Sequence, residues 1–257
     1  MYDAGSASNE TLIDSDAGPG LYDPPPRVAV DAIGNAFAIW VRQFPSRALA
    51  GRLFSAASNS WEDAGTVSIN SDAGSFSLAL AATGNGVVVW QQHDGIRHNI
   101  WHSRFVPNAT WTTPGLVENT SLGDSTSPRV AIAPNGDAVA VWLLSEGVQT
   151  NVWANRFVVA SGLWGTESRI DSPISGTSSS ALVEVDSLGN AVAAWNRTDG
   201  GQTSVWINRG SADGGWADAT MISAATDGYL PSLTTNGSGT AAVLWTASGT
   251  AWMRVCR

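Results

Sequence analysis

The chain contains one short motif five times, and this repetition constrains its fold more than any other feature. The motif is a Gly-containing turn, then alternating small apolar residues and a closing Trp, as in GNAFAIW at residues 34–40. The closing tryptophans are Trp40, Trp90, Trp142, Trp195 and Trp245, with successive spacings of 50, 52, 53 and 50 residues. A period near 50 residues is typical of propellers and other arrays in which each repeat forms one supersecondary unit.

Two further tryptophan positions recur in the repeats. A second Trp follows in four of them, and so does a third. The second set is Trp101, Trp153, Trp206 and Trp252, and the third set is Trp61, Trp111, Trp164 and Trp216. The three sets account for all 13 tryptophans of the chain, so no single Trp is marked out as a functional residue.

Each repeat is predicted to form four short antiparallel strands, which is the composition of a propeller blade. The first strand of each repeat is apolar and precedes a turn with Gly and Asn or Asp, residues that tolerate the positive φ of hairpin turns. These first strands are expected at 28–30, 78–80, 130–132, 183–185 and 233–235.

The two ends of the sequence predict how the array closes. The fifth repeat ends in its third strand, while NETLIDSD at 9–16 matches TESRIDSP at 166–173, a fourth-strand region. Residues 9–14 are therefore expected to pair with the last blade and close the ring, which removes two exposed sheet edges. The chain resembles a five-bladed β-propeller, all-β with four strands per blade, in a single domain over residues 1–257.

Composition excludes several classes of function. The net charge is −9, the sequence has no Lys and its basic residues form no cluster, so nucleic-acid binding is not expected. Cys256 is the only cysteine, which excludes an internal disulfide and a Cys-based metal site. No apolar run is long enough for a membrane span. The N-terminus has no leader, yet the acidic, Ser- and Thr-rich composition favours a secreted or cell-surface protein over the cytoplasmic alternative.

Residues that recur are expected to be structural. The closing Trp of each repeat is interpreted as packing between blades, with sugar stacking as the alternative. Arg104, Arg156 and Arg209 each follow the second Trp by three residues. They are expected to bind backbone carbonyls or an Asp inside the ring, and a sugar or anion site is the alternative.

Glu184 breaks the repeat pattern on a first strand. The corresponding residues are Ala29, Ala79, Ala131 and Thr234, so one carboxylate is predicted near the central channel. Five-bladed glycoside hydrolases carry two or three carboxylates on inner strands, because cleavage pairs an acid with a base or nucleophile. A lone Glu184 is interpreted as lining the channel, with catalysis as the alternative.

The three histidines, His93, His98 and His102, lie within ten residues and raise the question of a metal site. Residues four apart on a strand are separated by roughly 13 Å, so His98 and His102 cannot share one ion. His93 and His98 could meet across a hairpin near Asp94. No metal and no cofactor is expected.

The loops after the second strands vary most and are expected on one face, where a ligand would bind. Their amide, carboxylate and guanidinium groups are of the kind that bind sugar hydroxyls. The candidate ligand-binding residues are Arg42, Gln43, Gln91, Gln92, His93, Asp94, Glu146, Asn196, Arg197 and Asp199, together with Glu184.

The Trp-rich repeats resemble those of bacterial and fungal propeller lectins. This resemblance implies carbohydrate binding at repeated sites between blades, where several weak sites give avidity. The leading prediction is a non-catalytic, lectin-like module that is not an enzyme, with a glycan or protein ligand on the loop face. The alternatives are a protein-interaction scaffold and a glycoside hydrolase-like enzyme that uses Glu184, since the fold alone does not choose between them.

Overall fold

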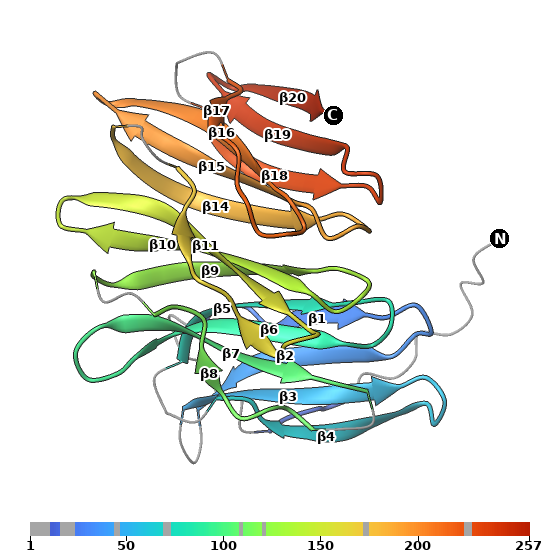
Figure 1. Cartoon of the computed structure of the whole chain (residues 1–257). Coiled ribbons are helices and arrows are strands. Elements are labelled where there is room, and N and C mark those ends of the chain that lie inside the picture. The colour runs from blue at the N-terminus through green and yellow to red at the C-terminus, as the bar shows by residue number, and fades with distance from the viewer. Residues whose placement is uncertain are drawn as a thin grey trace.

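Five antiparallel sheets follow one another along the chain in the computed structural model (Figure 1). The structure describes residues 11–15, 24–43, 47–68, 73–107, 110–119, 122–171, 175–223 and 228–257. Every regular element in these ranges is a strand. No helix of this part of the chain is long and apolar enough to span a membrane.

The strand order within each sheet follows the chain. The first sheet contains β1 (Arg27–Val30), β2 (Ala36–Arg42), β3 (Ala48–Ser55) and β4 (Ser60–Thr66). The second contains β5 (Ala73–Leu80), β6 (Gly86–His93), β7 (His98–Phe105) and β8 (Gly115–Leu116). The third contains β9 (Ser125–Ile132), β10 (Ala138–Glu146), β11 (Gln149–Val158), β12 (Leu163–Trp164) and β13 (Ser168–Arg169). The fourth contains β14 (Thr177–Val185), β15 (Ala191–Asp199), β16 (Gln202–Gly210) and β17 (Thr220–Met221). The last contains β18 (Tyr229–Thr235), β19 (Ala241–Ala247) and β20 (Thr250–Cys256).

The first strands of consecutive sheets contact one another, from β1 to β5, β9, β14 and β18. They therefore form the inner edge of the array, as expected for propeller blades. All five predicted first strands lie within these elements. The prediction of an all-β, five-bladed propeller is confirmed. Four of the first strands are longer than predicted because an irregularity in register extends their pairing, with positive φ at Ser127 and Ser180.

The closing tryptophans lie between sheets and are buried. Trp90, Trp142 and Trp195 are completely inaccessible to solvent, while Trp40 and Trp245 are 6% exposed. Trp142, for example, packs with Val117 and Ile100 of the preceding sheet. Burial of these indoles removes them from any sugar-stacking role and supports their interpretation as packing residues.

The fourth segment of each sheet is attached to the third strand in a repeated way. In the third sheet, Ile170 N donates to Val152 O at 2.9 Å, and Asp171 Oδ2 accepts from Val152 N at 3.0 Å. The same two contacts join Ser223 and its predecessor Ile222 to Val205 in the fourth sheet. Ile170 then packs beneath Trp195 of the next sheet. The fourth segment thus joins two blades.

Residues 9–14, which are predicted to close the ring, make the contact with the following sheet but not, among the described residues, the contact with a third strand. Ile13 packs on Ala38, Trp40 and Ala50 of the first sheet, and Trp40 Nε1 donates to Asp14 Oδ2 at 2.5 Å. Residues 11–14 form no strand, and residues 9 and 10 lie outside the described part. The last sheet has three strands, and the first and last sheets lie at opposite ends of the view in Figure 1. Closure by residues 9–14 therefore stays a prediction.

Candidate active site

A row of arginines joins consecutive sheets at the end that holds the turns between first and second strands. Arg156 Nη2 donates to Ser211 O of the fourth sheet at 3.0 Å. Arg209 donates through Nη1 to Gly239 O and through Nη2 to Cys256 O, both in the last sheet and both at 2.9 Å. The Arg104 guanidinium lies 4.0 Å from the centre of the Phe157 ring in the third sheet. These recurring arginines are structural links between blades, which agrees with the interpretation of the sequence.

The first sheet departs from this pattern at two positions that face each other. The strand register places Leu53 opposite Phe37, just as Arg104 lies opposite Val87. Leu53 therefore occupies the position of the linking arginine. On its other side Leu53 pairs with Glu62. In the second, third and fourth sheets, the residue whose backbone N–H donates to the carbonyl oxygen of the linking arginine is small. These residues are Thr112, Gly165 and Ala217.

A cavity of about 640 Å³ lies beside this exchange, between the first and second sheets. We call it the first groove. It is lined by Asp31, Ile33, Asn35, Phe37, Leu53, Ser55, Glu62, Asp63, Thr83, Gly84, Phe105, Pro107 and Thr110. The corresponding cavities between the third and fourth sheets and between the fourth and fifth measure about 240 and 560 Å³. Arginine side chains line both of these, whereas no Arg or His is among the residues of the first groove.

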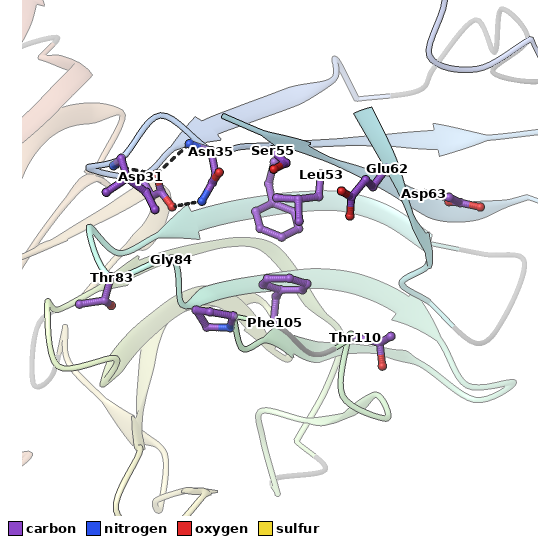
Figure 2. A pocket seen from close by; sticks show the side chains of 13 residues that line it. Asp31, Asn35, Leu53, Ser55, Glu62, Asp63, Thr83, Gly84, Phe105 and Thr110 are labelled. Atoms are coloured by element: carbon purple, nitrogen blue, oxygen red, sulfur yellow. Dashed lines mark hydrogen bonds between the residues drawn. The ribbon is translucent and has the colours of Figure 1, made fainter. Parts of the chain in front are cut away.

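Glu62 supplies an exposed carboxylate to the first groove. In Figure 2 its side chain points into the space above Phe105, while that of its neighbour Asp63 points away. No hydrogen bond or ion pair joins Glu62 to any residue that the structure describes, whereas Asp63 Oδ1 accepts from Gly65 N at 2.9 Å. The carboxylate of Glu62 is therefore available to a bound molecule.

The inner end of the first groove carries a second, fixed carboxylate. Asp31 Oδ1 accepts from Ile33 N and Asn35 N at 3.0 and 2.9 Å, and Asp31 Oδ2 accepts from Asn35 Nδ2 at 2.9 Å (Figure 2). Asp186 makes the same three contacts in the fourth sheet, so the arrangement belongs to the turn. In the first sheet this turn borders a cavity that also contains a free carboxylate.

The apolar part of the groove is aromatic. The rings of Phe37 and Phe105 meet edge to face with centroids 4.3 Å apart, and Trp111 supports both. Hydroxyl and amide groups of Asn35, Ser55 and Thr83 lie around this apolar surface. A concave site with an apolar floor and a few polar groups is the usual form of a small-molecule or sugar site.

Three of the predicted loop-face residues are buried, so their side chains are not accessible to a ligand. Arg197 is 1% exposed, and its Nη1 lies 2.9 Å from Asp171 Oδ2 in a buried ion pair. Gln92 is completely buried and accepts the Trp90 Nε1 hydrogen at 2.9 Å, and Asn196 is 4% exposed. Their prediction as ligand-binding residues is corrected by the structure, because polarity alone does not distinguish a solvated loop residue from a buried polar contact.

Most other predicted loop residues form hydrogen bonds within their own sheet or its flanking segments. Glu146 Oε1 accepts from Trp153 Nε1 at 2.8 Å, and Asp199 Oδ2 accepts from Ser175 Oγ at 2.6 Å. Asp94 accepts from Ile96 N and Arg97 N, contacts that lower the pKa of its carboxyl to about 2. Arg42 Nη2 donates to Thr66 Oγ1 at 3.0 Å.

His93, Gln43 and Gln91 complete the predicted set. His93 and His98 lie opposite each other across a hairpin, with ring centroids 4.9 Å apart, and His93 Nδ1 accepts from Gly95 N. Gln43 and Gln91 are half-buried. The described residues contain no group of three His, Cys, Asp or Glu side chains placed to hold a metal ion.

Glu184 lies on the inner strand β14, as predicted, and apart from the first groove. Its side chain is half-buried, and burial raises the pKa of its carboxyl. Such a group stays protonated to a higher pH than an exposed Glu. It is absent from the linings of the cavities described above, so the structure does not bring it together with the loop residues or with Glu62.

The first groove was not predicted from the sequence. The signal was present in the alignment of the repeats, where Leu53 replaces an arginine three residues after the second Trp position. The position of Glu62 was harder to find, because the third Trp and the residues after it vary in spacing from the third strand. Only the observed register pairs Glu62 with Leu53.

Comparisons with known proteins agree with this fold. The sequence matches no protein-family profile and no curated protein sequence. Among solved structures, the chain is similar to a polysaccharide lyase of family PL25, an ulvan lyase bound to -[GlcA(1-4)Rha3S]-, with a TM-score of 0.61 and 10% identity. That match covers 90% of this chain and 66% of the lyase, so the chain spans just under two thirds of its length.

Two further structures are similar over most of the chain. One is the GH93 α-L-arabinofuranosidase of Fusarium graminearum in complex with arabinobiose, with a TM-score of 0.57, 14% identity, and coverage of 92% of this chain and 77% of that one. The other is a Dyadobacter fermentans protein of unknown function, with a TM-score of 0.58, 14% identity, and coverage of 90% and 82%. These likenesses establish a propeller fold shared with carbohydrate-active proteins.

The comparisons correct two predictions. A non-catalytic, lectin-like module was expected, and a protein that is not an enzyme. The similar structures include a polysaccharide lyase and an arabinofuranosidase, which both catalyse reactions of glycans. They favour the enzyme alternative, and the specific resemblance to Trp-rich lectins does not extend beyond the propeller.

Proposed function

We propose that this protein is an enzyme that cleaves glycosidic bonds, with the first groove as its active site. One observation carries the proposal: at the position where the second, third and fourth sheets place a linking arginine against a small residue, the first sheet places Leu53 against Glu62. The exchange puts an exposed carboxylate without a partner among the described residues into a cavity that is large enough for sugar units.

The chemistry that fits this groove is hydrolysis. Water adds across the glycosidic bond, so the bond from the anomeric carbon to the leaving oxygen breaks and the water oxygen takes its place. A carboxyl group gives a proton to the leaving oxygen, and a carboxylate stabilises the positive charge on the sugar or takes a proton from water. Both groups must border the same cavity.

Glu62 and Asp31 supply two such groups in different surroundings. Glu62 is exposed and makes no described contact, so it can exchange a proton with substrate and solvent. Asp31 is held by three hydrogen bonds and provides a fixed negative charge at the inner end of the groove. We assign proton transfer to Glu62 and charge stabilisation to Asp31, since preorganised charge stabilises a cationic transition state most effectively.

The similar structures support the class of substrate. The ulvan lyase and the arabinofuranosidase both act on glycans according to their descriptions, and both share the propeller. The acidic, lysine-free chain is consistent with a secreted or cell-surface enzyme that meets such glycans outside the cell.

The experiment is a reducing-end assay on a panel of plant, algal and bacterial polysaccharides with wild-type protein and two variants. Wild-type protein is expected to release reducing ends from at least one polysaccharide, and Glu62→Gln to reduce that rate at least a hundredfold. Asp63→Asn is the matched control, because it removes a charge from the next residue, whose carboxylate points away from Glu62. An unchanged rate in Glu62→Gln, with loss of activity in Glu184→Gln, would move the active site to the inner strands.

A further inference from the structure

The lining of the first groove points to the charge of its substrate, an inference that rests on the proposed function. Three carboxylates border the groove, those of Asp31, Glu62 and Asp63. No Arg or His lies among the lining residues that the structure describes, and the chain has no Lys. The lining therefore carries negative charge, with no cation among its described residues.

The two grooves described between later sheets differ in this respect. Arg156 borders the groove between the third and fourth sheets, and Arg209 and Arg257 border the one between the fourth and fifth. In the first groove, Leu53 replaces the corresponding arginine. Val255 occupies this position in the last sheet, which no further sheet follows, so among the sheets that pack on a following one only the first lacks the arginine.

A charged glycan would not fit this lining. A uronate or sulfate group needs Arg, Lys or another cation to bind, and a carboxylate wall repels it. Abstraction of a proton next to a uronate, the step that a lyase performs, also requires neutralisation of the uronate carboxylate. The hydroxyl groups of a neutral sugar, in contrast, donate hydrogen bonds to carboxylates and to the side chains of Asn35, Ser55 and Thr83.

We propose that the first groove binds and cleaves neutral glycans and rejects uronate-containing and sulfated ones, with Leu53 as the residue that determines this preference. Leu53 acts in two ways: it leaves room where the arginine of other blades crosses to the next sheet, and it leaves the carboxylates unneutralised. The similar ulvan lyase, bound to a glucuronate-containing sulfated disaccharide, would then differ from this protein in substrate charge.

The test separates binding from cleavage. Affinity electrophoresis of the full chain in gels that contain arabinan, galactan or xylan reports binding to neutral polysaccharides, and gels with polygalacturonate or ulvan report binding to anionic ones. We expect retardation by at least one neutral polysaccharide and none by the anionic ones. The Leu53→Arg variant should weaken the neutral interaction at least tenfold, and Val148→Arg, which adds the same charge at a hairpin residue that is 98% exposed and outside the groove, should not.

The reducing-end assay on the same panel completes the test. Retardation by ulvan or polygalacturonate, or release of an unsaturated uronate from either, would overturn the preference for neutral glycans while a loss of activity in Glu62→Gln would still support the active site. Neutral binding that Leu53→Arg leaves unchanged, in a variant whose thermal unfolding matches that of wild type, would overturn the role of Leu53. Absence of both binding and cleavage on every polysaccharide would reject the proposed function together with this inference.

Discussion

His102 gives the account a quantitative prediction about stability. The residue lies on β7, and its ring faces Trp164 and Phe157 of the third sheet with centroids 5.4 and 6.4 Å away. Burial, and then the charge of Arg104, lower the pKa of His102 to about 4, from an ordinary value of 6.5. Its Nδ1 is buried and has no hydrogen-bond partner among the described residues.

The sign of the effect follows from linkage. Between the two pKa values the unfolded chain binds a proton at this histidine and the folded protein does not, so stability falls as the pH falls. With 1.36 kcal/mol per pKa unit, His102 removes about 2 kcal/mol from the free energy of unfolding between pH 7 and pH 5. The loss reaches about 3 kcal/mol at pH 4.

The perturbation is His102→Ile, because Ile207 occupies the corresponding position in the fourth sheet. Urea unfolding followed by tryptophan fluorescence at pH 7 and pH 5 gives the free energy of unfolding for both proteins. Other titrating groups contribute equally to each, so the difference between the two pH dependences isolates His102. Wild-type protein should lose about 2 kcal/mol more than the variant. Equal losses would refute the argument that this histidine is buried in its neutral form.

Three further predictions test the fold. Arg197→Leu removes one of the two cations that pair with the buried Asp171 and leaves Arg169 Nε at 2.7 Å, so it should cost about 3 kcal/mol in urea unfolding, the lower end for a broken buried ion pair. The double variant with Asp171→Ser should recover much of this loss, and a single variant with unchanged stability would restore Arg197 as a loop-face residue. Ile13→Asp should destabilise the first sheet. If residues 9–14 also pair with β20, hydrogen exchange at the Ala251 amide should be faster in the variant than in the wild-type protein. Exchange at the rate of an unprotected amide in both proteins would reject closure by residues 9–14. Gly84→Ala should destabilise the protein by about 1 kcal/mol or more, because Gly84 has a φ of +85° and a Cβ there would lie 3.1 Å from Pro107, and a stabilised variant in thermal unfolding would contradict the described turn.

The sequence was sufficient to predict the blades, because their features repeat. Each closing Trp followed a turn at the same spacing, so periodicity identified the strands and burial of the indoles followed from the need to pack sheet on sheet. Arg104, Arg156 and Arg209 were predicted as internal links for the same reason. The register irregularities near Ser127 and Ser180 were not predictable, because positive φ at serine leaves no clear mark in the sequence.

The candidate site was harder to predict because it depends on pairing between strands. Glu184 stood out in the aligned first strands, where the spacing is constant. Glu62 lies beyond a hairpin of variable length, so its position opposite Leu53 emerges only from the register of β3 and β4. Arg197 and Gln92 show the opposite error: loops were expected just after the closing Trp, but the second strands β15 and β6 continue through these residues and turn their side chains inward to Asp171 and Trp90.

The most direct test of the central claim is to locate a bound glycan. Crystals of Glu62→Gln, soaked with an oligosaccharide of the polysaccharide that wild-type protein cleaves, should show sugar density in the first groove. A glycosidic oxygen should lie within hydrogen-bonding distance of the residue 62 side chain. Density at the inner strands beside Glu184, or on the loops after the second strands, with the first groove empty, would contradict the account.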